Sequence, residues 1–209
     1  MADDELVKLI AKKVIEEAMS LDPKKVIVGV SNHHVHLCDE DFRELFGYDE
    51  PTVKTNVRQR GEFAANETVT LHGPKGSMRV RVMGPNRSAT QVELSRTDCF
   101  ALGIKAPMAQ SGFLDEAGPV EIEGPKGRVK CDHAAIVAGR HIHMGPDDAA
   151  KLGLKNHDRV SVLFGGERGA RLDNFLIRVK DSYTQELHLD TDEGNAVGVK
   201  TGDWATICR

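Results

Sequence analysis

The feature that most constrains this chain is an internal repeat. His141 and His143 lie 107 positions after His34 and His36, and the same spacing relates the residues that follow each pair. The matched stretches are His34-Val35-His36-Leu37 with Glu40-Asp41 and Leu45, and His141-Ile142-His143-Met144 with Asp147-Asp148 and Leu152. Each copy reads as a strand followed by a short helix that begins at an acidic residue and ends at a glycine. The repeat predicts two related β-barrels, each with one His-x-His pair at a strand end.

The rest of the chain favours a mainly β fold. Short β-branched or alternating runs recur along most of it, and two Gly-Pro-Lys-Gly turns separate pairs of them, at Gly73–Gly76 and Gly124–Gly127. A further copy of the repeat's helical part lies at Asp98–Ile104. Residues 3–19 place apolar side chains on one helical face and predict an N-terminal amphipathic helix. We therefore expect two β-barrels with short capping helices, plus this helix.

Composition excludes several classes of function. The formal net charge of −4 leaves no broad basic field for a nucleic-acid backbone, and one Trp and two Tyr offer little surface for stacking bases. No apolar run approaches the ~18 residues of a membrane span. The four cysteines are dispersed without a CxxC pair, which favours reduced thiols in a cytosol. We expect a cytoplasmic protein with neither nucleic acid nor membrane as a partner.

The spacing of the paired histidines favours a metal site on a strand. On a helix, positions i and i+2 point about 200° apart, whereas on a strand they share one face. The intervening Val35 and Ile142 are β-branched and apolar, so each motif prefers a strand with its middle residue in a core. Two imidazoles on one face can bind zinc at about 2.0–2.1 Å each. The alternative is a pair of hydrogen-bonded core histidines.

Zinc needs further ligands, and strand alternation suggests candidates. Leu187 and Leu189 take the apolar face of their strand and send His188 to the other, and Glu93 has the same setting. Both could equally be exposed strand residues. Arg87, in the loop Gly84-Pro85-Asn86-Arg87-Ser88, can present a bidentate fork to phosphate or can be a solvated loop residue. Cys38 follows the first pair closely and is expected to be a buried structural thiol rather than a soft metal ligand. The remaining histidines are expected to be surface or structural residues: His33, His72, His133 and His157.

Five motifs together resemble one family of enzymes. They are Ser31-Asn32-His33-His34-Val35-His36-Leu37, Gly84-Pro85-Asn86-Arg87-Ser88, Gln91-Val92-Glu93-Leu94-Ser95-Arg96-Thr97-Asp98, Arg140-His141-Ile142-His143-Met144 and His188-Leu189-Asp190-Thr191-Asp192-Glu193. In this order, from about Val26 to the C-terminus, the chain resembles the phosphate propanoyltransferases, which are phosphotransacylases of bacterial microcompartments such as those of propanediol degradation. The resemblance implies exchange of coenzyme A and phosphate on a short acyl group, propanoyl or acetyl.

The resemblance also implies a two-zinc site. One zinc would be bound by His34, His36 and Glu93, and the other by His141, His143 and His188. Arg87 would hold the phosphate as a catalytic residue. Coenzyme A is then a substrate, and its pocket would be lined by Ser31, Lys54, Arg81 and Asn195. The family fold places residues 23–32 with 139–209 in a first barrel and residues 33–138 in a second, after an N-terminal helical segment 1–22.

The resemblance extends to partners. Residues 1–20 are similar to the short peptides that direct such enzymes to the shell or core proteins of a microcompartment, and a helix packed on its own domain or on an oligomer partner is the alternative. A location inside a microcompartment and a homo-oligomer are expected. Two other readings of the metal ligands stay open. One is a binuclear zinc hydrolase with a bridging water, and the other is a structural module with closed four-ligand sites.

Overall fold

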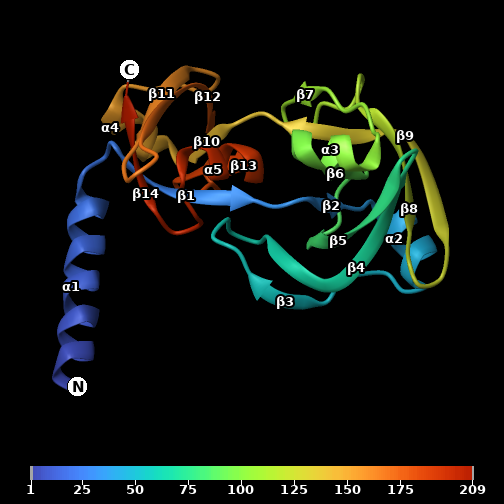
Figure 1. Cartoon of the computed structure of the whole chain (residues 1–209), viewed down its shortest axis with the longest axis horizontal. Helices are drawn as coiled ribbons and strands as arrows, with labels where there is room; N and C mark the ends of the chain where they lie inside the picture. The colour runs from blue at the N-terminus through green and yellow to red at the C-terminus, as the bar shows by residue number, and fades with distance from the viewer. Residues whose placement is uncertain (1, 209) are drawn as a thin grey trace. The chain divides into compact units, whose positions relative to one another are not determined.

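A computed structural model describes residues 2–208. Met1, the first residue of the expected segment 1–22, and Arg209, the last residue of the expected segment 139–209, lie outside the described residues. Short helices and many strands make up this part of the chain (Figure 1). The helices are α1 (Ala2–Leu21), α2 (Asp39–Phe46), α3 (Arg96–Leu102), α4 (Pro146–Leu152) and α5 (Thr191–Val197). The strands are β1 (Lys25–Ser31), β2 (His34–His36), β3 (Val53–Asn56), β4 (Phe63–Gly73), β5 (Gly76–Gly84), β6 (Gln91–Glu93), β7 (Met108–Ala109), β8 (Gly118–Glu123), β9 (Arg128–Ala138), β10 (His141–Met144), β11 (Arg159–Phe164), β12 (Ala170–Val179), β13 (Glu186–Asp190) and β14 (Trp204–Cys208).

One barrel is closed by strands from both ends of the described chain. Its order is β1-β13-β10-β12-β11-β14, and β1 returns to β14 through an antiparallel ladder that pairs Val26 with Ala205. β10, which carries the second histidine pair, runs parallel to β12, with His143 beside Arg178. The N-terminal strand thus completes a ring made otherwise by C-terminal strands.

The other barrel is closed by β8. The strands run in the order β4-β5-β2-β6-β9, and β8 pairs with both β4 and β9, which joins the two ends of that row. β3 continues from β4, and β7 pairs with β9. Two six-stranded barrels therefore confirm the expected mainly β fold of two related barrels with short helices.

The chain folds into two compact units. Within the described residues one unit comprises 2–29, 141–187 and 197–208, and the other comprises 30–140 and 188–196. The boundary near residue 140 falls just before the second histidine pair. The ranges expected from the family resemblance remain a proposal.

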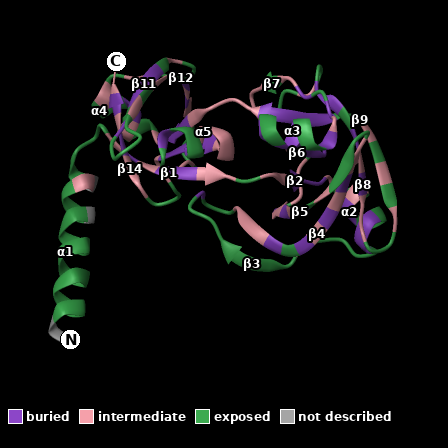
Figure 2. Cartoon of the chain, viewed as in Figure 1, coloured by how far each residue is buried: buried purple, intermediate pink, exposed green. Residues whose placement is uncertain are grey.

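The core of the second unit explains why its first histidine pair sits on a strand. Val35 lies between the two histidines and is fully buried, together with Val82 and Val92 on the neighbouring strands β5 and β6. α2 packs Phe42 and Leu45 into the same core. Buried residues alternate with partly exposed ones in the second half of β5, and two of the three residues in each of β2 and β6 are buried (Figure 2). Alternation along β2 therefore fixes the middle residue inward and both histidines on the opposite face.

The short helices repeat one design. α2, α3 and α4 each end at a glycine in the left-handed region, Gly47, Gly103 and Gly153, as the sequence repeat predicts. In each case the backbone N–H of that glycine donates to a carbonyl near the end of its helix. The repeat thus describes real strand-to-helix units.

α1 differs from the other helices because its apolar side chains are exposed. Leu6, Val7, Ile10 and Val14 are each more than half exposed. No helix in the described part of the chain is both long enough and apolar enough to cross a membrane. The expected amphipathic helix is therefore present.

Candidate functional site

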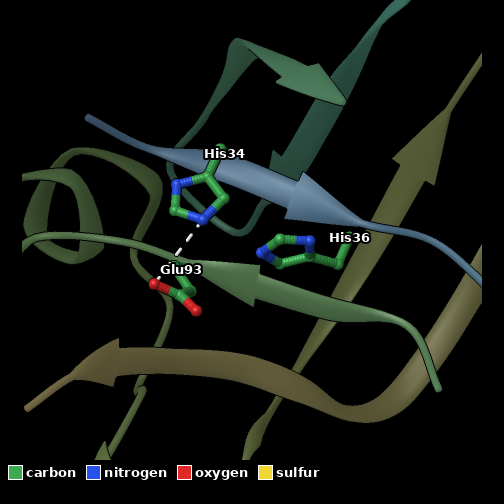
Figure 3. Close-up of side chains that lie close together, drawn as sticks. All are labelled: His34, His36 and Glu93. Atoms are coloured by element: carbon green, nitrogen blue, oxygen red, sulfur yellow. Dashed lines mark ion pairs between the residues drawn. The ribbon is translucent and has the colours of Figure 1, made fainter. Parts of the chain in front are cut away.

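The first histidine pair meets a carboxylate across two adjacent strands. β2 and β6 are antiparallel, and their register sets His34 directly opposite Glu93 and His36 opposite Gln91. His34 Nε2 lies 3.5 Å from Glu93 Oε2, and the rings of the two histidines meet edge-on with their centroids 5.0 Å apart. Figure 3 shows both imidazoles and the carboxylate turned toward one another. The sheet register thus brings the histidine pair together with a carboxylate from a separate motif.

These three side chains form a group of metal-ligand type. Their candidate ligand atoms all lie within 4.8 Å of one another, and no other group of three or more His, Cys, Asp and Glu residues within 2–208 meets that measure. Two atoms bound to one tetrahedral zinc at about 2.0–2.1 Å would stand about 3.3 Å apart. The separation of 3.5 Å between His34 and Glu93 is close to that value. The donor set of two nitrogens and one oxygen therefore fits zinc and leaves a fourth position for an exchangeable ligand.

The protonation of the two histidines also suits a metal. His34 Nδ1 lies 2.7 Å from the Asn32 carbonyl oxygen, which can only accept, so Nδ1 carries a proton and Nε2 is the ring nitrogen that faces Glu93. His36 is buried, and its Nδ1 has no hydrogen-bond partner among the described residues. Burial first, and then the nearby His34 and Arg87, hold the pKa of His36 well below its usual value, against the opposing effects of Glu93 and the Met83 backbone. The hydrogen bond at His34 Nδ1 and the lowered pKa of His36 are both features of histidines that bind a metal.

The arginine loop lies next to this group. The backbone N–H of Arg87 donates to the Leu37 carbonyl at 2.8 Å, which ties the loop to the segment just after β2. The guanidinium is about one-third exposed; Nη1 donates to Ser111 Oγ at 3.3 Å and Nη2 lies 3.3 Å from Glu62 Oε1. Its charge lowers the pKa of His36, so the cation acts on the histidine group. Arg87 is therefore not a fully solvated side chain, because it is partly buried and has two side-chain partners.

Two further side chains belong to the site and were not expected from the sequence. Gln91 is buried, and its Nε2 donates to Glu93 Oε1 at 2.6 Å and to Ser111 Oγ at 2.8 Å. Strand alternation could have identified Gln91, because it shares a face with Glu93 two positions later. Ser111 lies in a loop without a motif, and the sequence carries no signal for it.

The second histidine pair lies on β10 in the same way as the first lies on β2. Ile142 is fully buried between His141 and His143, whose ring centroids are 4.7 Å apart. His143 also stacks on Tyr183, with centroids 4.2 Å apart and an angle of 24° between the rings. His188 lies on β13, at the boundary between the two compact units. The role of these three histidines as a metal set remains a proposal.

A second, shorter repeat relates Glu93 to His188. Each residue lies on a strand that leads into a helix, two positions before the residue that caps that helix: Glu93 on β6 precedes Ser95 and α3, and His188 on β13 precedes Asp190 and α5. In α3 the side chain of Ser95 accepts a hydrogen bond from the backbone N–H of Asp98, and in α5 Asp190 accepts one from that of Glu193. The third ligand proposed for each metal thus occupies the same place before a capped helix.

The residues expected to line a coenzyme A pocket are spread over four elements. Ser31 ends β1, Lys54 is exposed on β3, and Asn195 is exposed on α5. Arg81 lies on β5 beside His34, and its Nη1 donates to the Ala65 carbonyl at 2.6 Å. Their role toward coenzyme A stays a prediction.

The other histidines have the partners that surface or structural residues have. His33 Nδ1 lies 3.2 Å from Asp98 Oδ1, and His72 Nε2 lies 2.6 Å from Glu123 Oε2. His133 Nδ1 lies 3.3 Å from the Ala117 carbonyl, and His157 Nε2 lies 3.2 Å from Asn156 Nδ2. Cys38 is half-buried rather than fully buried, and the Thr90 hydroxyl donates to its sulfur at 3.6 Å.

Comparison with known proteins extends over both barrels. A family model described as phosphate propanoyltransferase matches residues 27–200. A phosphate propanoyltransferase of Rhodopseudomonas palustris is 52% identical over 191 residues, which cover 90% of this chain and 84% of the relative. Proteins of the same name from Thermotoga maritima (49% over 186 residues, 87% of this chain and 88% of the relative) and Rhodobacter capsulatus (45% over 202 residues, 96% and 93%) are also similar. The matched range contains every residue expected at the site and begins after α1.

Proposed function

This chain belongs to the phosphate propanoyltransferase family and is a phosphotransacylase enzyme, and from that premise we propose that it interconverts short-chain acyl-CoA and acyl phosphate. Propanoyl-CoA and acetyl-CoA are the proposed acyl donors. A phosphate oxygen forms a bond to the acyl carbon, and the bond from that carbon to sulfur breaks, so that coenzyme A leaves as the thiolate. Phosphate and the acyl thioester must therefore be held side by side.

One observation carries the proposal: the Arg87 guanidinium donates to Ser111 Oγ, which also accepts from the Gln91 amide that binds Glu93, so the guanidinium adjoins the group of two histidines and one carboxylate. A guanidinium presents a rigid fork of donors that matches the geometry of phosphate oxygens. Its partial exposure leaves it accessible to a dissolved anion, and its two hydrogen-bond partners limit its orientation. Arg87 thus binds phosphate and turns one oxygen toward the acyl carbon, and such orientation of two reactants lowers a barrier by several kcal/mol.

Two zinc ions per chain are proposed as the resident metals. His34, His36 and Glu93 hold one, supported by the spacing of their ligand atoms and the orphaned Nδ1 of His36. His141, His143 and His188 hold the other, supported by the repeat of the histidine pair and by the equivalent places of Glu93 and His188. When bound, zinc supplies Lewis acidity toward a carbonyl oxygen and affinity for a thiolate. Ser31, Lys54, Arg81 and Asn195 are proposed to contact coenzyme A.

The N-terminal helix is proposed to recruit the enzyme to a bacterial microcompartment. α1 precedes the residues that the family model matches, and its apolar face is exposed. Both features suit a docking peptide for shell or core proteins. A homo-oligomer in the cytoplasm, enclosed with its partners, completes this proposal.

A thiol assay tests the function. The purified chain is mixed with propanoyl-CoA or acetyl-CoA, with and without inorganic phosphate, and free thiol is followed in time. Thiol release that depends on phosphate, with acyl phosphate formed in equal amount, is expected. Release without phosphate would instead indicate a zinc hydrolase. The absence of release under any condition would indicate a structural module without enzymatic activity. Metal analysis before and after chelation, with activity measured on both samples, tests the zinc ions.

A further inference from the structure

We propose that Gln91 and Ser111 are positioning residues that join the Glu93 carboxylate to the Arg87 guanidinium through one hydrogen-bonded bridge. The inference rests on the proposed function, because it assigns phosphate to Arg87 and a metal to Glu93. It adds the hydrogen bonds that hold the Glu93 carboxylate and the Arg87 guanidinium in fixed positions relative to each other.

The orientation of the Gln91 amide is fixed by its partners. The backbone N–H of Gly112 can only donate, and it lies 2.7 Å from Gln91 Oε1. The other end of the amide is therefore Nε2, whose two hydrogens are directed to Glu93 Oε1 at 2.6 Å and Ser111 Oγ at 2.8 Å. With a side chain that is almost entirely buried, Gln91 has its acceptor and both donors engaged.

The bridge determines which oxygen of Glu93 faces the histidines. Oε1 accepts from Gln91, while Oε2 lies 3.5 Å from His34 Nε2. Without the amide, the carboxylate could rotate about its terminal torsion, which is broad and roughly two-fold. Hydrogen bonds of this kind to a metal-binding carboxylate commonly change metal affinity by about 10–100-fold. Gln91 thus holds one oxygen in place and leaves the other directed at the ligand group.

The same bridge reaches the arginine through the serine hydroxyl. Ser111 Oγ accepts from Gln91 Nε2 and from Arg87 Nη1 at 3.3 Å. Ser111 sits in a turn closed by the Phe113 backbone N–H donating to the Gln110 carbonyl, and Gly112 has a φ of 97° in that turn. The third position of such a turn favours glycine, so the loop has a defined shape. A shift at either end of the bridge is therefore transmitted to the other.

Matched substitutions test the two ends of the bridge separately. Ser111→Ala removes the acceptor of Arg87, and we expect the KM for phosphate to rise about tenfold, with the KM for propanoyl-CoA and the bound zinc unchanged. Ser111→Thr keeps the hydroxyl and should restore the phosphate KM. Gln91→Met keeps the volume but removes the amide, and it should raise the phosphate KM and also weaken zinc retention against a chelator about tenfold. Ser77→Ala, at an exposed position on β5, serves as the control.

The readouts separate positioning from a purely structural role. In cobalt-substituted protein, the absorption bands should change in Gln91→Met and stay unchanged in Ser111→Ala. Normal phosphate KM and normal zinc retention in both variants would overturn the proposal. A lower kcat that accompanies a lower melting temperature, with KM unchanged and no rescue by threonine, would also overturn it. If the unsubstituted chain proves inactive with phosphate, the proposed function fails, while zinc retention and the cobalt spectrum still decide whether Gln91 positions Glu93.

Discussion

Arg140 Nη2 lies 2.6 Å from Glu193 Oε1, and this ion pair repeats the position that His33 and Asp98 hold elsewhere in the same compact unit. In both cases the residue just before a His-x-His pair contacts an acidic residue in the first turn of the helix that follows a proposed metal ligand. The residue before each histidine strand therefore contacts an acidic side chain of a helix.

Removing the cation of the Arg140–Glu193 pair should destabilise the fold. The Arg140 and Glu193 side chains are mostly buried, and burial raises the pKa of Glu193 although Arg140 opposes the rise. Arg140→Met leaves the carboxylate without its cation, at an expected cost of about 3 kcal/mol in the free energy of unfolding. The Arg140→Met/Glu193→Gln double variant should recover much of this loss in urea unfolding at neutral pH. Equal losses in the single and double variants would show that the arginine acts through packing alone.

Removing the proposed phosphate ligand should affect one substrate. Arg87→Ala is expected to lower kcat/KM for phosphate by at least about tenfold, because a charge-assisted contact is lost. Zinc content should stay unchanged. Arg79→Ala, an exposed arginine on β5 that donates to Thr68, is the matched control. Loss of zinc together with activity would mean that Arg87 has a structural role.

The ion pair between Glu62 and Arg87 should compete with phosphate. Both side chains are about one-third exposed, and one carboxylate oxygen lies 3.3 Å from the guanidinium. Glu62→Gln removes the competing charge, and since partly exposed pairs contribute about 0.2–1 kcal/mol, the KM for phosphate should fall by a factor of roughly 1.4 to 5. Steady-state kinetics with phosphate as the varied substrate measures this, with exposed Glu50→Gln as the control. A rise in the KM would mean that Glu62 orients the arginine for phosphate.

Acid stability should depend on Glu67. Burial alone would raise the pKa of this buried carboxylate, but hydrogen bonds from Thr52 and Tyr48 outweigh burial and bring it below its usual value. A lowered pKa in the folded state stabilises the protein above the unfolded pKa of about 4.3, and that contribution is lost as the pH falls through the lower folded value. Glu67→Gln should therefore flatten the decline of unfolding free energy below about pH 4.3. Glu116→Gln, at an exposed position, should retain the full decline.

Deleting residues 1–20 should separate catalysis from location. These residues form most of α1 and precede the matched range 27–200, so phosphate-dependent thiol release by the truncated enzyme should equal that of the full chain. Recruitment of a fluorescent fusion to microcompartments should be abolished. An inactive truncated enzyme that remains folded by circular dichroism would contradict this prediction.

The sequence predicted the parts of the fold that follow from local periodicity. Alternation around Val35 and Ile142 placed both histidine pairs on strands, and the offset of the pairs implied two similar barrels. The sequence did not show which strand closes the second barrel, because β8 pairs with two strands that are remote from each other in sequence. Ser111 was missed for a related reason: its role depends on contacts with Gln91 and Arg87 that form only when the chain folds. The correspondence of Glu93 with His188 required knowing which helix follows each strand.

The double pairing of β8 also affects how these molecules meet one another. Along Thr70–His72 of β4 and Arg128–Cys131 of β9, both flanks of β8 are already occupied, so that stretch offers no open backbone to a neighbouring chain. Intermolecular β-sheets begin to form at edge strands whose backbone N–H and C=O groups are unpaired. The closed part of the second barrel therefore gives a neighbouring molecule no strand edge to extend, and strand addition to this sheet is restricted to its end strands β3 and β7.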